Sequence, residues 1–455
     1  MRGDYETYSD SEGGIAVSNL LVLVVFLGLF VGLASGHPIS FVLGGLGVIM
    51  GLTGWGISCF EIFVNTTFGL MNNYTLVAVP LFILMANFLT ASNVAEGLFD
   101  SVRFLLGRIS GGLGLAVILV STVFAACTGV VGASVVTMGL LSITPLLRYG
   151  YDKGLTAGII CGGGTLGILI PPSIMLVVMA AAAQISVGKL FLAAVFPGLT
   201  LSLCYCIYIL YVCWRHPEKG PAISKEELEK IPLREGLWRC LVNLMPPLLL
   251  VVSVLGTIYT GVATPTEASG MGAFIALLMT VGYRRFSLKM LRDSVFDAAK
   301  TTGMCLVIMI GAQAFTAMFL GLGGDEVVKR AIAFFGLGKW GIFILMNAVV
   351  FILGCFLDWM GIVSIVLPIF LPLAREAGFD MIWLMAVIAT TLQTCFLTPP
   401  FGFALFYIKG IAPEGMTTAD IYRGIIPFVV IILFVVALIT IFPEIVMWLP
   451  SRARA

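Results

Sequence analysis

The chain has 455 residues, of which 60% are hydrophobic and 11% are charged, and its formal net charge is +1. An ordinary soluble domain carries about 25% charged residues, so the composition excludes one, and the near-neutral charge gives no indication of a nucleic-acid partner. Apolar runs of about 18 or more residues recur along the whole chain without the alternation of a β-barrel. These features predict an all-α integral membrane protein with many spans.

The apolar runs fall into two halves. A polar tail (1–15) precedes the first half (16–213), which is predicted to contain spans at about 16–34, 39–57, 73–91 and 190–213 and longer segments at 112–147 and 153–182. The polar stretch 214–239 reads as a linker. The second half (240–449) offers spans at about 240–261, 265–283, 299–321 and 421–449, longer segments at 340–373 and 381–410, and then a C-terminal tail (450–455).

The two halves share a spaced motif. Asp152 precedes Pro171 by 19 positions, and Asp380 precedes Pro399 by the same interval. Each proline begins a Pro-Pro pair, and an arginine lies just upstream of each aspartate. Matching motifs predict an internal repeat, which is a signature of secondary transporters, although two Pro-Pro pairs could also have arisen by chance.

The segments 112–147 and 340–373 are predicted to be re-entrant hairpins. With glycine near the middle, each arm would have about 13 residues and a length of roughly 20 Å, too short for a bilayer core of about 30 Å. Five full spans then remain in each half, and an odd number requires the halves to insert with opposite orientation. This arrangement places 17 of the 25 Lys and Arg residues on one side, which the positive-inside rule assigns to the cytoplasm. The linker is then cytoplasmic and both termini are periplasmic.

The Pro-Pro segments are predicted to be broken helices. In GGGTLGILIPPS the three glycines weaken a helix, and Pro171 and Pro172 remove two backbone donors. The second segment, TTLQTCFLTPPFG, contains Pro399 and Pro400. A broken helix at membrane depth is tolerated where it lines a cavity, and its freed carbonyls can coordinate a cation. The alternative is a pair of structural kinks.

The hairpin turns offer further oxygen ligands. The first turn reads CTGVVGASVV and the second GCFLDWMGIVS. Asp358 is the only acid deep inside an apolar segment of either hairpin. Because burying an unpaired charge is costly, Asp358 is a candidate for coupling-ion binding or gating, with a structural hydrogen bond as the alternative.

Other polar residues favour structural roles. Glu267 follows Thr264 by three positions, which favours a helix-capping box over an ion site. The two histidines, His37 and His216, lie near predicted helix ends, and none of the ten cysteines forms a CxxC pair, so a metal site is not indicated.

A resemblance to a known family rests on four parts of the sequence: GGGTLGILIPPS, TPTEASG, FLDWMGIVSIVLPIFLP and TPPFGFALFYIKGI. Over nearly its full length the chain resembles the large membrane subunit of tripartite ATP-independent periplasmic (TRAP) transporters. The more distant divalent anion–sodium symporters look similar in layout.

The resemblance implies a sodium-coupled elevator transporter with scaffold and transport domains, which takes up a small organic anion, a carboxylate. It implies two Na⁺ sites where hairpin tips meet the broken helices, and a solute site between the tips. The residues that it suggests for the first ion site are Gly129, Gly132, Ser134, Gly163, Thr165 and Gly167. Those for the second are Asp358, Gly361, Thr391, Gln393 and Thr394. Those for the solute are Ser134, Pro171, Pro172, Ser173, Thr398, Pro399 and Pro400.

The resemblance also implies partners. A periplasmic substrate-binding protein would deliver the solute, and a separate small four-helix membrane subunit would brace the scaffold. The first hairpin turn is less Ser-rich here than in many relatives, which puts the side-chain ligands of the first ion site in doubt. The alternatives are a self-sufficient symporter of the same superfamily, a passive channel and an integral-membrane enzyme, and the absence of a membrane nucleophile or metal-ligand set argues against the enzyme.

Overall fold

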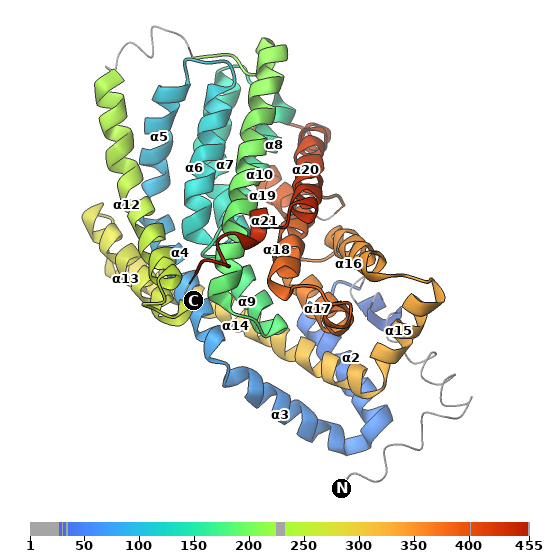
Figure 1. Ribbon diagram of the computed structural model, residues 1–455. Coiled ribbons are helices and arrows are strands. Elements are labelled where there is room, and N and C mark those ends of the chain that lie inside the picture. The colour runs from blue at the N-terminus through green and yellow to red at the C-terminus, as the bar shows by residue number, and fades with distance from the viewer. Residues whose placement is uncertain (1–26, 30, 33–34, 224–232, 401, 454–455) are drawn as a thin grey trace. The chain divides into compact units, whose positions relative to one another are not determined.

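Every regular element is helical in the computed structural model, which describes residues 27–29, 31–32, 35–223, 233–400 and 402–453 (Figure 1). Within this part, eight helices are long and apolar enough to cross a bilayer, or nine if the bent pair α15 and α16 is one span. The prediction of a multi-pass helical membrane protein is therefore confirmed. The predicted span 16–34 lies mostly outside the described residues.

The helices of the first half run from α2 to α10. They are α2 (Ile39–Trp55), α3 (Cys59–Met71), α4 (Ala78–Ser92), α5 (Val94–Leu106), α6 (Gly112–Thr128), α7 (Val131–Arg148), α8 (Lys153–Thr165), α9 (Ile174–Ala183) and α10 (Val187–Arg215). Short 3₁₀ turns are η1 (Gly56–Ser58), η2 (Tyr74–Val77), η3 (Leu166–Ile168) and η4 (Pro217–Lys219).

The second half runs from α12 to α21 and contains the 3₁₀ turn η5 (Gln393–Phe396). Its helices are α12 (Leu233–Tyr259), α13 (Pro265–Gly282), α14 (Leu288–Gly321), α15 (Gly324–Phe334), α16 (Lys339–Gly354), α17 (Trp359–Glu376), α18 (Met381–Leu392), α19 (Phe403–Ile411), α20 (Thr418–Ile441) and α21 (Glu444–Met447).

The described residues form two compact units. The first contains the residues up to Asn73 together with Gly303–Val349 and Met360–Phe379. The second contains Tyr74–Thr302, Val350–Trp359 and the residues from Asp380 onward. In the first unit α2 packs on the second part of α14 through glycine, since a Cβ at Gly311 would lie 2.5 Å from the Ser40 carbonyl oxygen.

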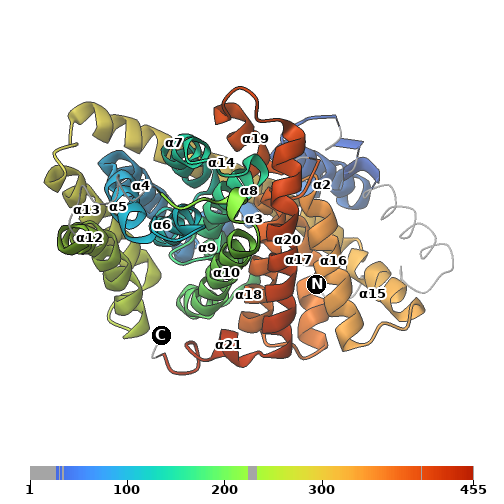
Figure 2. The same cartoon turned by 90° about the horizontal axis from the view of Figure 1, so that it is seen from above.

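Small residues also bring helices together in the second unit, where α8 runs beside α20 (Figure 2). A Cβ at Gly424 would lie 1.8 Å from the Gly154 carbonyl oxygen, and one at Gly158 would lie 2.3 Å from the Gly424 carbonyl oxygen. Gly162 is covered by Phe428, whose Cδ1 would lie 2.4 Å from an added Cβ. Close backbone approach of this kind is typical of helix packing in membranes.

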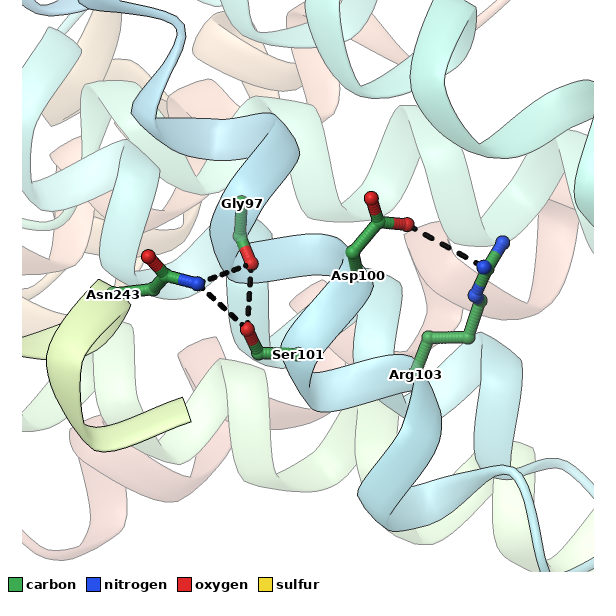
Figure 3. Close-up of polar contacts among 5 residues, drawn as sticks. All are labelled: Gly97, Asp100, Ser101, Arg103 and Asn243. Carbon is green, nitrogen blue, oxygen red and sulfur yellow. Dashed lines mark hydrogen bonds and ion pairs between the residues drawn. The ribbon is translucent and has the colours of Figure 1, made fainter. Parts of the chain in front are cut away.

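A polar contact joins α5 to α12 in the same unit (Figure 3). The side-chain amide of Asn243 donates to the Gly97 carbonyl oxygen at 2.9 Å and to the Ser101 hydroxyl at 2.7 Å. The Ser101 hydroxyl in turn donates to the Gly97 carbonyl oxygen at 2.7 Å. An interhelical hydrogen bond of this type stabilises a membrane helix pair, because few other partners exist for a half-buried amide in a bilayer.

Both predicted hairpins return to the end at which they begin. The Leu113 N–H at the start of α6 donates to the Tyr151 hydroxyl, just beyond the end of α7, at 3.2 Å. At the second hairpin, the ammonium group of Lys339 at the start of α16 donates to the Gly378 carbonyl oxygen, beyond α17, at 2.9 Å.

The arms are longer than the 13 residues expected from the sequence. They have 17 residues in α6, 18 in α7, 16 in α16 and 18 in α17. The expectation was wrong because it removed too many residues for the turn, which needs only Gly129 and Val130 between α6 and α7. An 18-residue arm is about 27 Å long, so α7 and α17 count among the eight helices above, and the length of these arms does not by itself make the hairpins re-entrant.

Two further boundaries differ from the sequence prediction. Helix α14 begins at Leu288, well before the predicted start at 299, because the added turns carry charged residues and form no apolar run. Helix α8 continues through Gly162–Gly164 to Thr165. The three glycines therefore serve close packing against neighbouring helices, and the helix breaks only after them.

Candidate functional site

The tip of the first hairpin lies against the first broken helix. Helix α6 ends at Thr128, and Gly129 takes a left-handed conformation with a φ of 62°, which favours glycine. A Cβ at Gly129 would lie 3.3 Å from the Pro172 carbonyl oxygen and 3.5 Å from the Ser173 Cα. The hairpin tip therefore contacts the point at which α9 begins.

A buried pair of hydroxyl groups lies beside this contact. Thr128 Oγ1 and Ser134 Oγ are 2.9 Å apart, and both residues are at most 2% exposed. A Cβ at Gly167, in η3, would lie 3.3 Å from Ser134 Oγ. The structure thus brings together Gly129, Ser134 and Gly167 from the predicted first ion site, with Thr128 as their neighbour.

The other residues predicted for the first ion site have different neighbours. A Cβ at Gly163 would lie 2.8 Å from the hydroxyl of Ser121 on α6. The Thr165 hydroxyl donates to the Gly162 carbonyl oxygen at 3.0 Å. The direct contribution of Gly163 and Thr165 to ion binding stays a prediction.

The two broken helices share one order of elements. Asp152 caps α8 by accepting from the Leu155 N–H at 2.9 Å, and Asp380 caps α18 by accepting from the N–H groups of Ile382 and Trp383 at 2.8 and 3.0 Å. Each helix then passes into a 3₁₀ turn, a cis Pro-Pro pair and a second short helix. The aspartates that marked the repeat in the sequence are therefore helix caps. In the first broken helix the Ser173 hydroxyl donates to the Ile168 carbonyl oxygen.

Gln393 opens the 3₁₀ turn of the second broken helix and has an unusual environment. Its residue is 0% exposed, and neither its amide oxygen nor its amide nitrogen has a hydrogen-bond partner among the residues that the structure describes. A buried polar group without a partner costs about 1–3 kcal/mol. Such a group is rare in native proteins and points to a bound ion, water or ligand.

The threonines around Gln393 are satisfied within their own helix. The Thr394 hydroxyl donates to the Thr391 carbonyl oxygen at 2.7 Å, and the Thr391 hydroxyl donates to the Val387 carbonyl oxygen at 3.1 Å. The Thr398 hydroxyl donates to the Thr394 carbonyl oxygen. A hydroxyl group that donates one hydrogen bond can in general still ligate a cation through its oxygen. Thr398 is 9% exposed, and Pro399 and Pro400 are exposed.

The tip of the second hairpin reaches the same 3₁₀ turn. A Cβ at Gly354 would lie 2.8 Å from the thiol sulfur of Cys395, which is buried in η5. Asp358 follows Gly354 by four positions and directly precedes α17. The structure therefore places Asp358 near the turn that carries Gln393, in the second unit. Gly361 lies in the first unit.

One neighbour of the first hairpin tip was not predicted. A Cβ at Gly132 would lie 3.0 Å from Cζ and 3.1 Å from the hydroxyl oxygen of Tyr407. Tyr407 belongs to α19, the second half of the second broken helix, and is 40% exposed. The sequence offered the aromatic residue in FALFYIKG but no signal for its pairing with the other half of the chain.

A cavity of about 470 Å³ opens beside the first hairpin tip, at Ala133. Its other walls are the end of α4 and the beginning of α14, which contribute Asn87, Thr90, Ala91, Ser287, Lys289, Met290, Asp293, Ser294 and Asp297. The Asn87 side chain donates to the Ser294 carbonyl oxygen at 3.0 Å, which holds these two walls together. The volume is suitable for a small organic solute.

The Glu267 prediction is confirmed. The Thr264 N–H donates to Glu267 Oε2 at 2.8 Å, and the Glu267 N–H donates to Thr264 Oγ1 at 3.3 Å, which completes a capping box at the start of α13. Among the described residues, no group of three or more His, Cys, Asp or Glu side chains could hold a metal ion.

Comparison with known proteins gives a consistent assignment. Residues 26–445 match the model of the family described as "Tripartite ATP-independent periplasmic transporter, DctM component". The chain is 35% identical over 385 residues to a C4-dicarboxylate TRAP transporter large permease protein of Pseudomonas aeruginosa, a match that covers 83% of this chain and 87% of that protein. It is 32% identical to the Vibrio cholerae protein of the same description, with 96% and 98% covered.

More distant likenesses agree. A sialic acid TRAP transporter large permease protein of Vibrio cholerae is 26% identical, with 93% of this chain and 96% of that protein covered. The crystal structure of the Alcanivorax borkumensis YdaH transporter matches with a TM-score of 0.60 and 13% identity, covering 95% of this chain and 98% of that chain, and this likeness concerns the fold alone. The relatives are transporter permease subunits and not enzymes, and the apolar helices agree with a multi-pass inner-membrane location. The chain belongs to the DctM family, the large permease subunits of the tripartite ATP-independent periplasmic transporters.

Proposed function

We propose that this subunit couples the entry of Na⁺ to the uptake of a small carboxylate, and that four-carbon dicarboxylates are the substrate class. The substrate class is supported by the relatives at 35% and 32% identity, both of which are described as C4-dicarboxylate permeases. The solute reaches the subunit from a periplasmic binding protein, and a small four-helix membrane subunit braces the scaffold.

The buried amide of Gln393 is the observation that carries the proposal of a coupling ion. Its oxygen has no partner among the described residues, and it lies in the 3₁₀ turn that the tip of the second hairpin contacts. Hard cations favour carbonyl, hydroxyl and carboxylate oxygens, which Gln393, Thr391, Thr394 and Asp358 supply there. A bound Na⁺ would satisfy the amide oxygen and offset the cost of burying it.

A second coupling ion binds at the first hairpin tip, near Ser134 and Gly167. Support comes from the buried hydroxyl pair of Thr128 and Ser134 beside a break in the neighbouring helix. The solute lies close to the start of α9, at Ser173, where the helix dipole favours an anion. Tyr407 adds a phenol next to Gly132, and the cavity at Ala133 gives the solute a path along α4.

The subunit works as an elevator built from two inverted repeats, 16–213 and 240–449. The shared order of cap, 3₁₀ turn, Pro-Pro pair and short helix supports the repeat. The first hairpin opens to the cytoplasm and the second to the periplasm, because this orientation follows the bias in Lys and Arg. Both termini then lie in the periplasm.

Uptake into proteoliposomes tests this function. The chain and its small subunit are reconstituted, the cognate binding protein is added outside, and entry of radiolabelled succinate is measured with an inward gradient of Na⁺ or of choline. We expect saturable uptake in Na⁺ only. Equal uptake in choline would contradict sodium coupling, and failure to transport succinate would contradict the substrate class. Uptake without the binding protein would favour a self-sufficient symporter, and unsaturable flux would favour a channel.

A further inference from the structure

The first four turns of α14 present three different sides. Ser294 and Ala298 are buried and form the inner side. Lys289, Asp293 and Asp297 follow one another at intervals of four and line the cavity described above. The third side adjoins the cavity side, and its residues are exposed.

The third side combines large apolar side chains with cations. Leu288, Val295 and Phe296 are 77%, 46% and 64% exposed, and Arg292 and Lys300 are exposed between and beyond them. Intervals of three and four residues place all five on one stripe of the helix. The Arg292 guanidinium lies 5.5 Å from the centroid of the Phe296 ring, so the charged and the apolar groups are in contact.

The loop that leads into α14 also combines cations with an apolar side chain. Arg284 and Arg285 lie just beyond the end of α13, and Phe286 follows them with 43% exposure. The two arginines also complement the dipole at the end of α13, which explains part of their placement. Arg292 and Lys300 lie inside α14, so the dipole of α13 does not explain their positions. We call the set Arg284, Arg285, Phe286, Leu288, Arg292, Val295, Phe296 and Lys300 the basic apolar face.

The cations of the basic apolar face have no acidic partner in the part of the chain that the structure describes. Elsewhere the exposed arginines Arg239 and Arg330 form ion pairs four residues away on their own helices, with Glu235 and Glu326. The nearest acids on α14, Asp293 and Asp297, line the cavity and form no ion pair with Arg292 or Lys300. The face therefore carries four unpaired positive charges next to four exposed apolar side chains.

We propose that the basic apolar face lies in the membrane–water interface and binds the headgroups of anionic phospholipids. Helices that lie in this interface present Lys and Arg together with Phe and Leu, since the apolar groups enter the acyl boundary while the cations reach phosphate. Clusters of four or more cations next to a membrane span are typical of anionic-lipid binding. The proposal requires only that the protein is embedded in a membrane, and it does not depend on the coupling ion or the solute.

Lipid binding to the purified full chain tests the proposal. Native mass spectrometry counts the phosphatidylglycerol and phosphatidylcholine molecules that the protein retains in a lipid titration. We expect the protein to prefer phosphatidylglycerol. The double variant Arg292→Gln, Lys300→Gln should bind phosphatidylglycerol about 30-fold more weakly, because each cation near an anionic lipid surface strengthens binding about five-fold. The matched control Arg215→Gln, Lys219→Gln removes two exposed cations elsewhere and should leave the preference unchanged.

The salt dependence of binding and the co-purification of the small membrane subunit test the proposal further. Higher salt should weaken phosphatidylglycerol binding by the wild type, because exposed charges are screened, and a salt-independent preference would overturn the proposal. Equal binding of both lipids by the wild type, or an undiminished preference in the double variant, would overturn it as well. If the double variant instead lost only the small membrane subunit on co-purification, the face would be a protein interface and the lipid proposal would be wrong.

Discussion

The substitution Gln393→Leu should stabilise the protein without Na⁺ and remove the share of the stabilisation by Na⁺ that comes from the second hairpin. Gln393 is fully buried, and its amide oxygen and nitrogen both lack hydrogen-bond partners among the described residues. An apolar side chain of similar size removes the cost of those two groups, so the ion-free variant should gain about 2 kcal/mol in free energy of unfolding. Each occupied Na⁺ site should add about 2.7 kcal/mol when Na⁺ is raised to 100 times the dissociation constant of that site, and the variant should lack one such increment.

Thermal unfolding of the purified chain in detergent measures both effects. Na⁺ is titrated against choline at constant ionic strength, so that screening stays the same. Thr390→Val is the matched control, because the Thr390 hydroxyl is buried on the same helix and already donates to the Ala386 carbonyl oxygen at 2.8 Å. The Thr390→Val control should have a lower free energy of unfolding than the wild type, and Na⁺ should stabilise it as much as the wild type. A Gln393→Leu variant that is less stable than the wild type without Na⁺, and is stabilised by Na⁺ as much as the wild type, would refute the reasoning.

Four further substitutions test other contacts. Gly424→Leu should destabilise the protein by at least about 3 kcal/mol, because a Cβ there would lie 1.8 Å from the Gly154 carbonyl oxygen, and a normal yield on size-exclusion chromatography would contradict this. Asp152→Ala and Asp380→Ala should each lower the free energy of unfolding by about 0.5–2 kcal/mol through loss of a helix cap, which chemical denaturation would measure. Asp358→Asn should weaken sodium-dependent uptake while the protein still inserts and folds, and unchanged sodium dependence would remove Asp358 from the ion site.

Much of the fold was predictable because the bilayer imposes strong rules on sequence. Apolar runs located most spans, and the glycine-centred segments identified both hairpins. The capping box at Glu267 followed from residue types at fixed spacing and was confirmed. The extension of α14 to Leu288 was missed because its first turns are amphipathic and carry charges, so the search for apolar runs began too late.

The candidate site was predictable where local sequence defines it. The contact of Gly129 with the start of α9, and that of Gly354 with η5, joined segments that the sequence had already marked. The pairing of Gly132 with Tyr407 was not predictable, since it depends on how segments 275 positions apart pack together. The isolation of the Gln393 amide also depends on three-dimensional surroundings, because nothing in TTLQTC indicates which neighbours lack hydrogen-bonding groups.

The most direct test of the inverted architecture is the labelling of single cysteines from each side of the membrane. In a background without the ten native cysteines, cysteine is placed at Arg108 or Lys153, outside the first hairpin, and at Phe335 or Glu376, outside the second. With a membrane-impermeant maleimide, the first pair should label only from the cytoplasm and the second pair only from the periplasm. Labelling of Arg108 and Lys153 from opposite sides would contradict the architecture and the ion sites that depend on it.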